Sequence, residues 1–300
     1  MTSVQKTLEV PHLGGTTANY WLSSADASKP TLVLIHSFAT SVDIYRPQFS
    51  NNALTGRYNL LAVDVLGHGK TRTKSPHWTY WDTAIVNLQV LEQLGLKAGY
   101  VPVGTSQGGF VAVRMALLAP QSVLGIVLLG TSLDYESERT MKLRCWDAGK
   151  ILTGIIDALS TTGSMPDFEP DDNFCDLTID TGFGSGVSSA DRDFWRQAIK
   201  TNWGGDAGRR QARMAAICLR DRDGLHGRVF DVLCPVLWMQ GTADVVYSVE
   251  NATEEIKLFV NSPDTRLQVV DGGQHYLSFS NPDEVNAALL DFATKCANEA

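Results

Sequence analysis

Short, almost entirely apolar runs alternate along the chain with stretches in which apolar residues recur at helical spacing. The runs "TLVLIH" (31–36) and "YNLLAVDV" (58–65) are nearly continuous in apolar residues, as expected of strands that are buried on both faces. An opening antiparallel pair is predicted from "TLEV" and "ANYWLS", which "PHLGGTT" separates. Further strands are predicted at 100–105, 124–130, 234–241 and 265–272.

Helical patterns separate these strands. "WDTAIVNLQVLEQLGL" places its apolar residues close to one face, and "GGFVAVRMALLAP" ends at a proline. A last helix is predicted to begin at "SNPDEV". This alternation indicates an α/β fold with a mostly parallel central sheet flanked by helices.

Residues 133–230 interrupt the alternation. They contain helical stretches such as "MKLRCWDAGKILTGIIDAL" and "DRDFWRQAIK" but no convincing strand. We therefore expect a core formed by residues 1–132 and 231–300, with 133–230 inserted as a helical unit between two strands.

Composition narrows the classes of partner. The 300 residues carry a formal net charge of −8, which argues against nucleic acid and anionic membranes as main partners. We expect no signal peptide and no membrane span, because no apolar run is long enough. The five cysteines form no C-x-x-C pair, so we expect a cytoplasmic protein without disulfides, metal or cofactor. Oligomeric state is not predicted.

Ser106 lies in the pattern Gly104-Thr105-Ser106-Gln107-Gly108, after a predicted strand and before a predicted helix. A nucleophile on such a sharp turn needs strained backbone dihedrals and small neighbours, which the glycines provide. The following helix N-terminus also favours developing negative charge. The sequence therefore predicts Ser106 as a nucleophile rather than an ordinary turn residue.

A serine hydroxyl needs a base and a group that orients this base. His275 is the predicted base, because its loop leaves the last predicted strand, and strand C-terminal ends gather the site in such sheets. Asp244 is favoured as the acid, since its strand directly precedes that of His275. Asp134, which follows an earlier strand, is the alternative.

The sequence resembles the α/β-hydrolase superfamily, specifically its members with a helical cap. Four landmarks carry the resemblance: "LIHSF" (34–38), "DVLGHGKT" (64–71), "GTSQGG" (104–109), and "GTAD" (241–244) with "GGQH" (272–275). The resemblance implies that residues 133–230 form the cap (lid) and that the substrate pocket lies between cap and core.

The same resemblance implies an oxyanion hole made by the backbone N–H groups of Phe38 and Gln107. In related proteins a glycine usually occupies the position of Ser37. Because a glycine-only dihedral would strain serine by about 1 kcal/mol or more, either the loop avoids that conformation or its geometry is unusual. Ser37 could instead offer its hydroxyl to substrate.

The expected activity is that of a serine hydrolase, because related epoxide hydrolases and dehalogenases carry Asp in place of Ser106. The expected substrate is a mid-sized apolar ester, lactone or thioester, with Trp146, Phe183 and Trp195 as candidate contacts in the inserted segment. The same triad would also suit hydrolysis of a C–C bond or lactone formation from a thioester. A non-catalytic ligand receptor that reuses the fold is a third interpretation.

Overall fold

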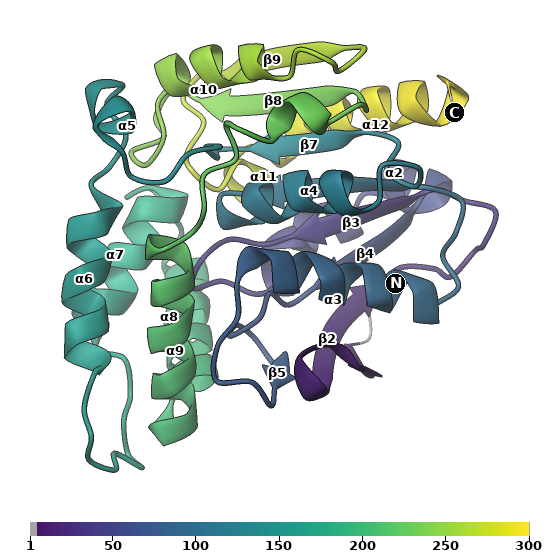
Figure 1. The fold of residues 1–300 in the computed structure, drawn as a ribbon. Coiled ribbons are helices and arrows are strands. Elements are labelled where there is room, and N and C mark those ends of the chain that lie inside the picture. Colours follow the sequence, from purple (N-terminus) through teal and green to yellow (C-terminus); the bar gives the residue numbers. More distant parts are fainter. Residues whose placement is uncertain (1–4, 300) are drawn as a thin grey trace.

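One sheet of nine strands organises the part of the chain that the computed structural model describes, residues 5–299. Its hydrogen-bonded order is β1-β2-β4-β3-β6-β7-β8-β9, and β5 pairs with β2 (Figure 1). The strands from β4 to β9 along this order are parallel, whereas β2 pairs antiparallel with β1, β4 and β5. The strands are β1 (Lys6–Val10), β2 (Thr16–Leu22), β3 (Thr31–Ile35), β4 (Asn59–Val63), β5 (Arg72–Thr73), β6 (Tyr100–Thr105), β7 (Ile126–Leu129), β8 (Val236–Gly241) and β9 (Thr265–Val270).

The eight strands expected from the apolar runs are all present, so the predicted α/β class is confirmed. The opening antiparallel pair is β1 with β2, and it aligns Val10 with Thr16. β5 was not predicted, because a strand of two residues is too short to show any alternation.

Helices cover both faces of the sheet. Figure 1 shows α3 and α4 on one face and α12 on the other. β3 shows why its sequence is apolar throughout: Val33 and Ile35 pack in the cluster that contains the α3 and α4 side chains, whereas Leu32 and Leu34 pack with those of α12. The helices are α1 (Arg46–Phe49), α2 (Asn52–Arg57), α3 (Tyr80–Gln93), α4 (Gln107–Leu118), α5 (Glu138–Lys142), α6 (Ala148–Leu159), α7 (Asp172–Phe183), α8 (Ser189–Trp203), α9 (Gly205–Arg220), α10 (Val249–Glu255), α11 (Leu277–Ser280) and α12 (Pro282–Glu299). Among residues 5–299, no helix has both the length and the apolar character needed to cross a membrane.

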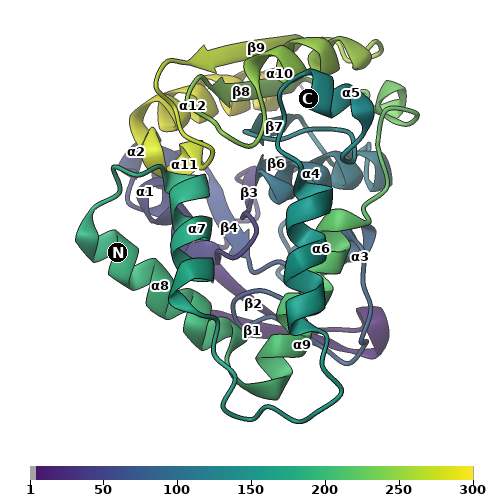
Figure 2. The ribbon, with the colours of Figure 1, turned by 90° about the vertical axis from the view of Figure 1, so that its left-hand side faces the viewer.

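Between β7 and β8 the chain leaves the sheet and forms α5 to α9. Helix α6 packs against α9 and α7 against α8, and Figure 2 shows α6 and α7 in front of the sheet. The stretch 141–159 is split into α5 and α6, because Arg144 adopts a left-handed φ of 63° and Asp147 caps the new helix. The indole N–H of Trp203 donates to Gly67 O at 2.9 Å and so ties α8 to the loop after β4.

Buried ionisable groups hold the loops that follow β3 and β4. The Asp64 carboxylate accepts hydrogen bonds from the backbone N–H groups of Val42 and Lys70, at 2.9 and 2.8 Å. His36 Nε2 accepts from Val65 N–H at 2.9 Å, and His68 lies with its ring 5.5 Å from that of His36. Burial lowers the pKa of His36 to about 4 and that of His68 to about 3, and it raises the pKa of Asp64 to about 6.

These pKa values predict that acid weakens the fold. Below the ordinary histidine pKa of 6.5, His36 and His68 each bind a proton in the unfolded chain. In the folded protein both stay neutral until the pH falls to about 4 for His36 and about 3 for His68. Asp64 has the opposite effect on stability, because its carboxylate binds a proton below about pH 6 in the folded state and only near pH 3.8 in the unfolded chain. The net difference of one proton should lower the free energy of unfolding by about 1.4 kcal/mol per pH unit between pH 6 and about 4.

Urea unfolding of the wild type at pH 7.5 and 4.5 measures this loss. His36→Gln keeps a donor and an acceptor but cannot titrate, so we expect it to lose less stability between the two pH values. His77→Gln, at an exposed histidine, is the matched control and should behave as the wild type does. Equal pH dependence in wild type and His36→Gln would contradict the assignment.

Candidate active site

Ser106 occupies a strained turn between β6 and α4. Its backbone has φ 53° and ψ −116°, in a region that residues with a Cβ rarely adopt. Two hydrogen bonds hold it there: Ser106 N–H donates to Leu129 O at 2.9 Å, and the Thr131 hydroxyl donates to Ser106 O at 2.7 Å. The side chain is thereby directed away from the strand, at the C-terminal edge of the sheet.

The glycines beside Ser106 are required by close backbone packing. A Cβ on Gly104 would lie 2.1 Å from Gly108 O, and one on Gly108 would lie 1.9 Å from Ile35 O. Neither contact can be relieved by a rotamer change, because both partners are backbone atoms. The G-x-S-x-G pattern is therefore explained by the fit of the turn between β6, α4 and β3.

The structure brings Ser106, His275 and Asp244 together. His275, in the loop between β9 and α11, places Nε2 2.8 Å from Ser106 Oγ. Its Nδ1 lies 3.0 Å from Asp244 Oδ2. A carboxylate can only accept, so these partners assign the ring hydrogen to Nδ1 and leave Nε2 to accept from the serine hydroxyl. All three side chains are almost fully buried.

The Asp244 carboxylate is itself held by fixed donors. Its Oδ1 accepts from Val246 N–H and Tyr247 N–H at 2.7 and 3.0 Å, and its Oδ2 accepts from the Gln240 amide at 2.8 Å. These donors offset the cost of burying the charge and fix the direction of the oxygen that faces His275.

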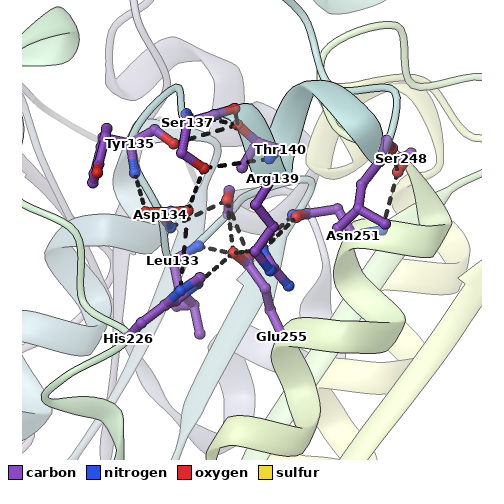
Figure 3. A network of polar contacts seen from close by, with 12 residues as sticks. Leu133, Asp134, Tyr135, Ser137, Arg139, Thr140, His226, Ser248, Asn251 and Glu255 are labelled. Atoms are coloured by element: carbon purple, nitrogen blue, oxygen red, sulfur yellow. Dashed lines mark hydrogen bonds and ion pairs between the residues drawn. The ribbon is translucent and has the colours of Figure 1, made fainter.

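Asp134, the alternative acid, lies in a separate network (Figure 3). Its carboxylate accepts from Tyr135 N–H and the Ser137 hydroxyl, at 2.9 and 2.8 Å, and lies 4.0 Å from His226 Nδ1. The structure therefore places Asp244, and not Asp134, beside His275.

Glu255 is the centre of that second network and was not anticipated from the sequence. The fully buried carboxylate accepts from Leu133 N–H at 2.7 Å, from Arg139 at 3.2 Å and contacts His226 Nε2 at 2.8 Å. Figure 3 shows these residues converging on it. Leu133 and His226 lie near the beginning and the end of the segment between β7 and β8. The Glu255 side chain therefore contacts this segment both where the chain leaves the core and where it returns to it.

Phe38 lines the cavity at Ser106, and Gln107 directly follows Ser106 in the chain. Within residues 5–299 neither N–H group has a backbone acceptor. Ser37 avoids the left-handed conformation, and the positive φ of this loop falls at Ala39, at 57°. The first of the two expectations for Ser37 is thus correct. The Tyr276 hydroxyl donates to Phe38 O at 3.0 Å and so holds the peptide that links Phe38 to Ala39.

The side chain of Gln107 is held from two sides. The Tyr80 hydroxyl donates to its Oε1 at 3.1 Å, and its Nε2 lies 3.4 Å from His68 Nε2. Tyr80 and Tyr276 were missed by the sequence analysis. Tyr276 directly follows His275, so its place near the site could have been predicted but not its contact with Phe38. Nothing in the sequence indicates that Tyr80 contacts Gln107.

A cavity of about 60 Å³ lies at Ser106 and His275. Two of the candidate contacts, Ser37 and Trp146, line it. Among residues 5–299 no group of three or more His, Cys, Asp or Glu side chains is arranged to hold a metal ion.

Phe183 and Trp195, the other two candidates, line neither this cavity nor the larger one beside it. Their rings stack on each other at 5.2 Å, and Phe183 packs edge-on against Tyr276 at 4.9 Å. They form a packing layer against Tyr276, and the two cavities give no support to their prediction as substrate contacts. Aromatic residues within a helical segment are more often packed in the protein interior than against a ligand, and the sequence does not distinguish these two roles.

Comparison with known proteins identifies the fold class. A family model described as alpha/beta hydrolase fold matches residues 30–154. The uncharacterized carboxylesterase nap of Bacillus subtilis is 23% identical over 273 residues, which cover 90% of this chain and 81% of that protein. Three other curated relatives match over 99 to 139 residues, so the chain spans only 26 to 33% of their length.

Solved structures agree on the fold. A thermophilic esterase from Thermogutta terrifontis superposes with a TM-score of 0.78 at 16% identity, covering 97% of this chain and 99% of that one. The enol-lactonase from Burkholderia xenovorans LB400 superposes with a TM-score of 0.75 at 18% identity, covering 96% and 100%. The solved structures and the family model therefore show that the chain has the α/β-hydrolase fold.

Proposed function

We propose that the protein is a serine hydrolase that cleaves a mid-sized apolar ester, lactone or thioester through an acyl-enzyme. One observation carries the proposal: a strained serine, a histidine and a buried aspartate from three separate strand ends are connected by hydrogen bonds of 2.8 and 3.0 Å. A ligand receptor has no need of this arrangement, whereas a nucleophile does.

In the first half-reaction Ser106 Oγ attacks the substrate carbonyl while His275 Nε2 takes the hydroxyl proton. Negative charge then develops on the carbonyl oxygen. The N–H groups of Phe38 and Gln107 are the proposed donors to that oxygen, and the N-terminus of α4 adds its positive partial charge. His275 returns the proton to the leaving group, and the acyl-enzyme remains on Ser106.

In the second half-reaction His275 takes a proton from water, which attacks the acyl carbon. His275 then returns this proton to Ser106 Oγ as the bond to the acyl group breaks and the acid leaves. Asp244 keeps the ring in the tautomer that both steps need and stabilises its charged form. Both half-reactions use the same donors and the same base, so the site needs no further group.

We further propose that residues 133–230 act as a cap over this site. Phe174 and Trp146 come from this segment and line the cavity at Ser106. The contacts of Glu255 with Leu133 and His226 hold the two ends of the segment against α10. The proteins compared above over most of the chain are named as a carboxylesterase, an esterase and an enol-lactonase, and these names favour an ester or lactone bond over a C–C bond.

Labelling with a fluorophosphonate tests the proposal. The wild type should acquire one covalent label, because the reagent needs a nucleophile, a base and oxyanion donors together. Ser106→Ala should remain unlabelled, and Ser28→Ala, at an exposed serine, should be labelled as the wild type is. Equal labelling of wild type and Ser106→Ala would refute the assigned nucleophile.

Replacement of the acid gives a second prediction. Asp244→Asn should lose kcat on the order of 10⁴-fold with p-nitrophenyl esters, because the amide favours the wrong tautomer of His275. Asp134→Asn, the matched control, should retain most activity, since its carboxylate contacts Tyr135 and Ser137 instead. The large loss in Asp134→Asn with little in Asp244→Asn would overturn the assignment.

A further inference from the structure

A second and much larger cavity adjoins the one at Ser106. Its volume is about 540 Å³, within the range of small-molecule sites, whereas about 60 Å³ at Ser106 is far below the roughly 300–1,000 Å³ of such sites. The two share five lining residues: Phe38, Ile151, Ile155, Phe174 and Leu177. The small cavity therefore accommodates the reacting group, and the rest of a substrate must extend into the larger one.

The larger cavity is a groove lined by residues of α6 and α7, the two helices that Figure 2 shows in front of the sheet. Ile151 on α6 is 39% exposed and Leu177 on α7 is 57% exposed. Large apolar side chains that face each other across a groove and remain open to solvent mark a surface that an apolar ligand covers.

Gly154 keeps this groove open. It lies in the interior of α6, where glycine costs roughly 0.5–1 kcal/mol relative to alanine. A Cβ at Gly154 would have no atom within 4 Å, so packing against the protein does not require a glycine there. Gly154 lines the groove. A larger side chain at this position would therefore occupy volume that is open to a ligand.

The charged groups at the groove are acidic. Of the residues that the structure describes, 5–299, Glu169 and Asp171 line it, and no lysine, arginine or histidine does. The Lys200 ammonium forms an ion pair with Glu169 at 2.7 Å, and it forms a second ion pair with Asp172 at the same distance. An anionic ligand would meet two carboxylates and no free cation, at a cost in Coulomb energy.

We infer that, given the proposed ester hydrolysis, the groove between α6 and α7 binds an extended, uncharged apolar chain of the substrate, and that Gly154 sets the length of chain it admits. The inference narrows the substrate class to neutral long-chain esters or lactones. Thioesters of phosphate-bearing carriers are disfavoured by the acidic groove.

Chain-length kinetics test the inference. We would measure kcat/KM for p-nitrophenyl esters from acetate to decanoate and for acetates of alcohols from methyl to decyl. In at least one series, lengthening the chain should raise kcat/KM of the wild type about tenfold or more. Gly154→Leu should remove that gain and leave the shortest ester unaffected, because leucine fills the groove but is remote from Ser106.

Gly149→Leu is the matched control. It adds the same side chain to the same helix, where a Cβ meets only Asp147 at 3.7 Å, and it does not line the groove. Both substitutions favour the helix, so thermal unfolding should show no loss, and Gly154→Ala provides a smaller step. Equal effects of Gly154→Leu on short and long esters, or none on either, would overturn the inference.

Charge is tested with a substrate pair of equal length, p-nitrophenyl octanoate and the p-nitrophenyl monoester of octanedioic acid. The wild type should prefer the neutral ester by roughly tenfold. The double variant Glu169→Gln, Asp171→Asn should lessen this preference, and its asparagine can still cap α7 by accepting from Phe174 N–H. A wild type that prefers the charged ester would contradict the inference.

The two proposals fail differently. Absence of Ser106-dependent hydrolysis of every ester would refute the proposed function. Turnover of short esters with no dependence on chain length in either series would refute only the assignment of the groove.

Discussion

The backbone strain at Ser106 is the constraint on which the rest of the site depends. A residue with a Cβ held at φ 53° is stable only where its surroundings leave no alternative. Here the close contacts of Gly104 with Gly108, and of Gly108 with Ile35, bring α4 against the ends of β6 and β3. The same contacts aim the hydroxyl at His275 and place the N-terminus of α4 behind it.

The parallel sheet supplies the other groups. Strand β8 lies beside β7 and β9 lies beside β8 in the parallel part of the sheet. Their C-terminal ends therefore share one edge with that of β6, and Asp244 and His275 reach Ser106 from segments more than a hundred residues away. Gly130, at the end of β7, has φ 52°, and a Cβ there would lie 2.6 Å from His275 O. The positions of His275 and Asp244 are thus fixed by backbone packing as well as by their own hydrogen bonds.

The sequence predicted the sheet well, because buried parallel strands are continuous apolar runs and their order along the chain is simple. It also predicted the grouping of Ser106, Asp244 and His275, since each follows a strand and strand ends meet at one edge. It did not predict the parts that depend on packing between distant segments. Glu255 between Leu133 and His226 is one example, and Tyr80 on Gln107 is another. The packing of Phe183 on Trp195 and Tyr276 was likewise not predicted.

The small cavity at Ser106 and His275 adjoins a larger, mostly apolar groove between α6 and α7 that two carboxylates line. Trapping of the intermediate tests the central claim most directly. After brief reaction with a p-nitrophenyl ester and an acid quench, mass spectrometry of the digested protein should find the acyl group on the peptide that contains Ser106. Product formation with the acyl group on another residue, or with no acylated peptide at any quench time, would contradict the account.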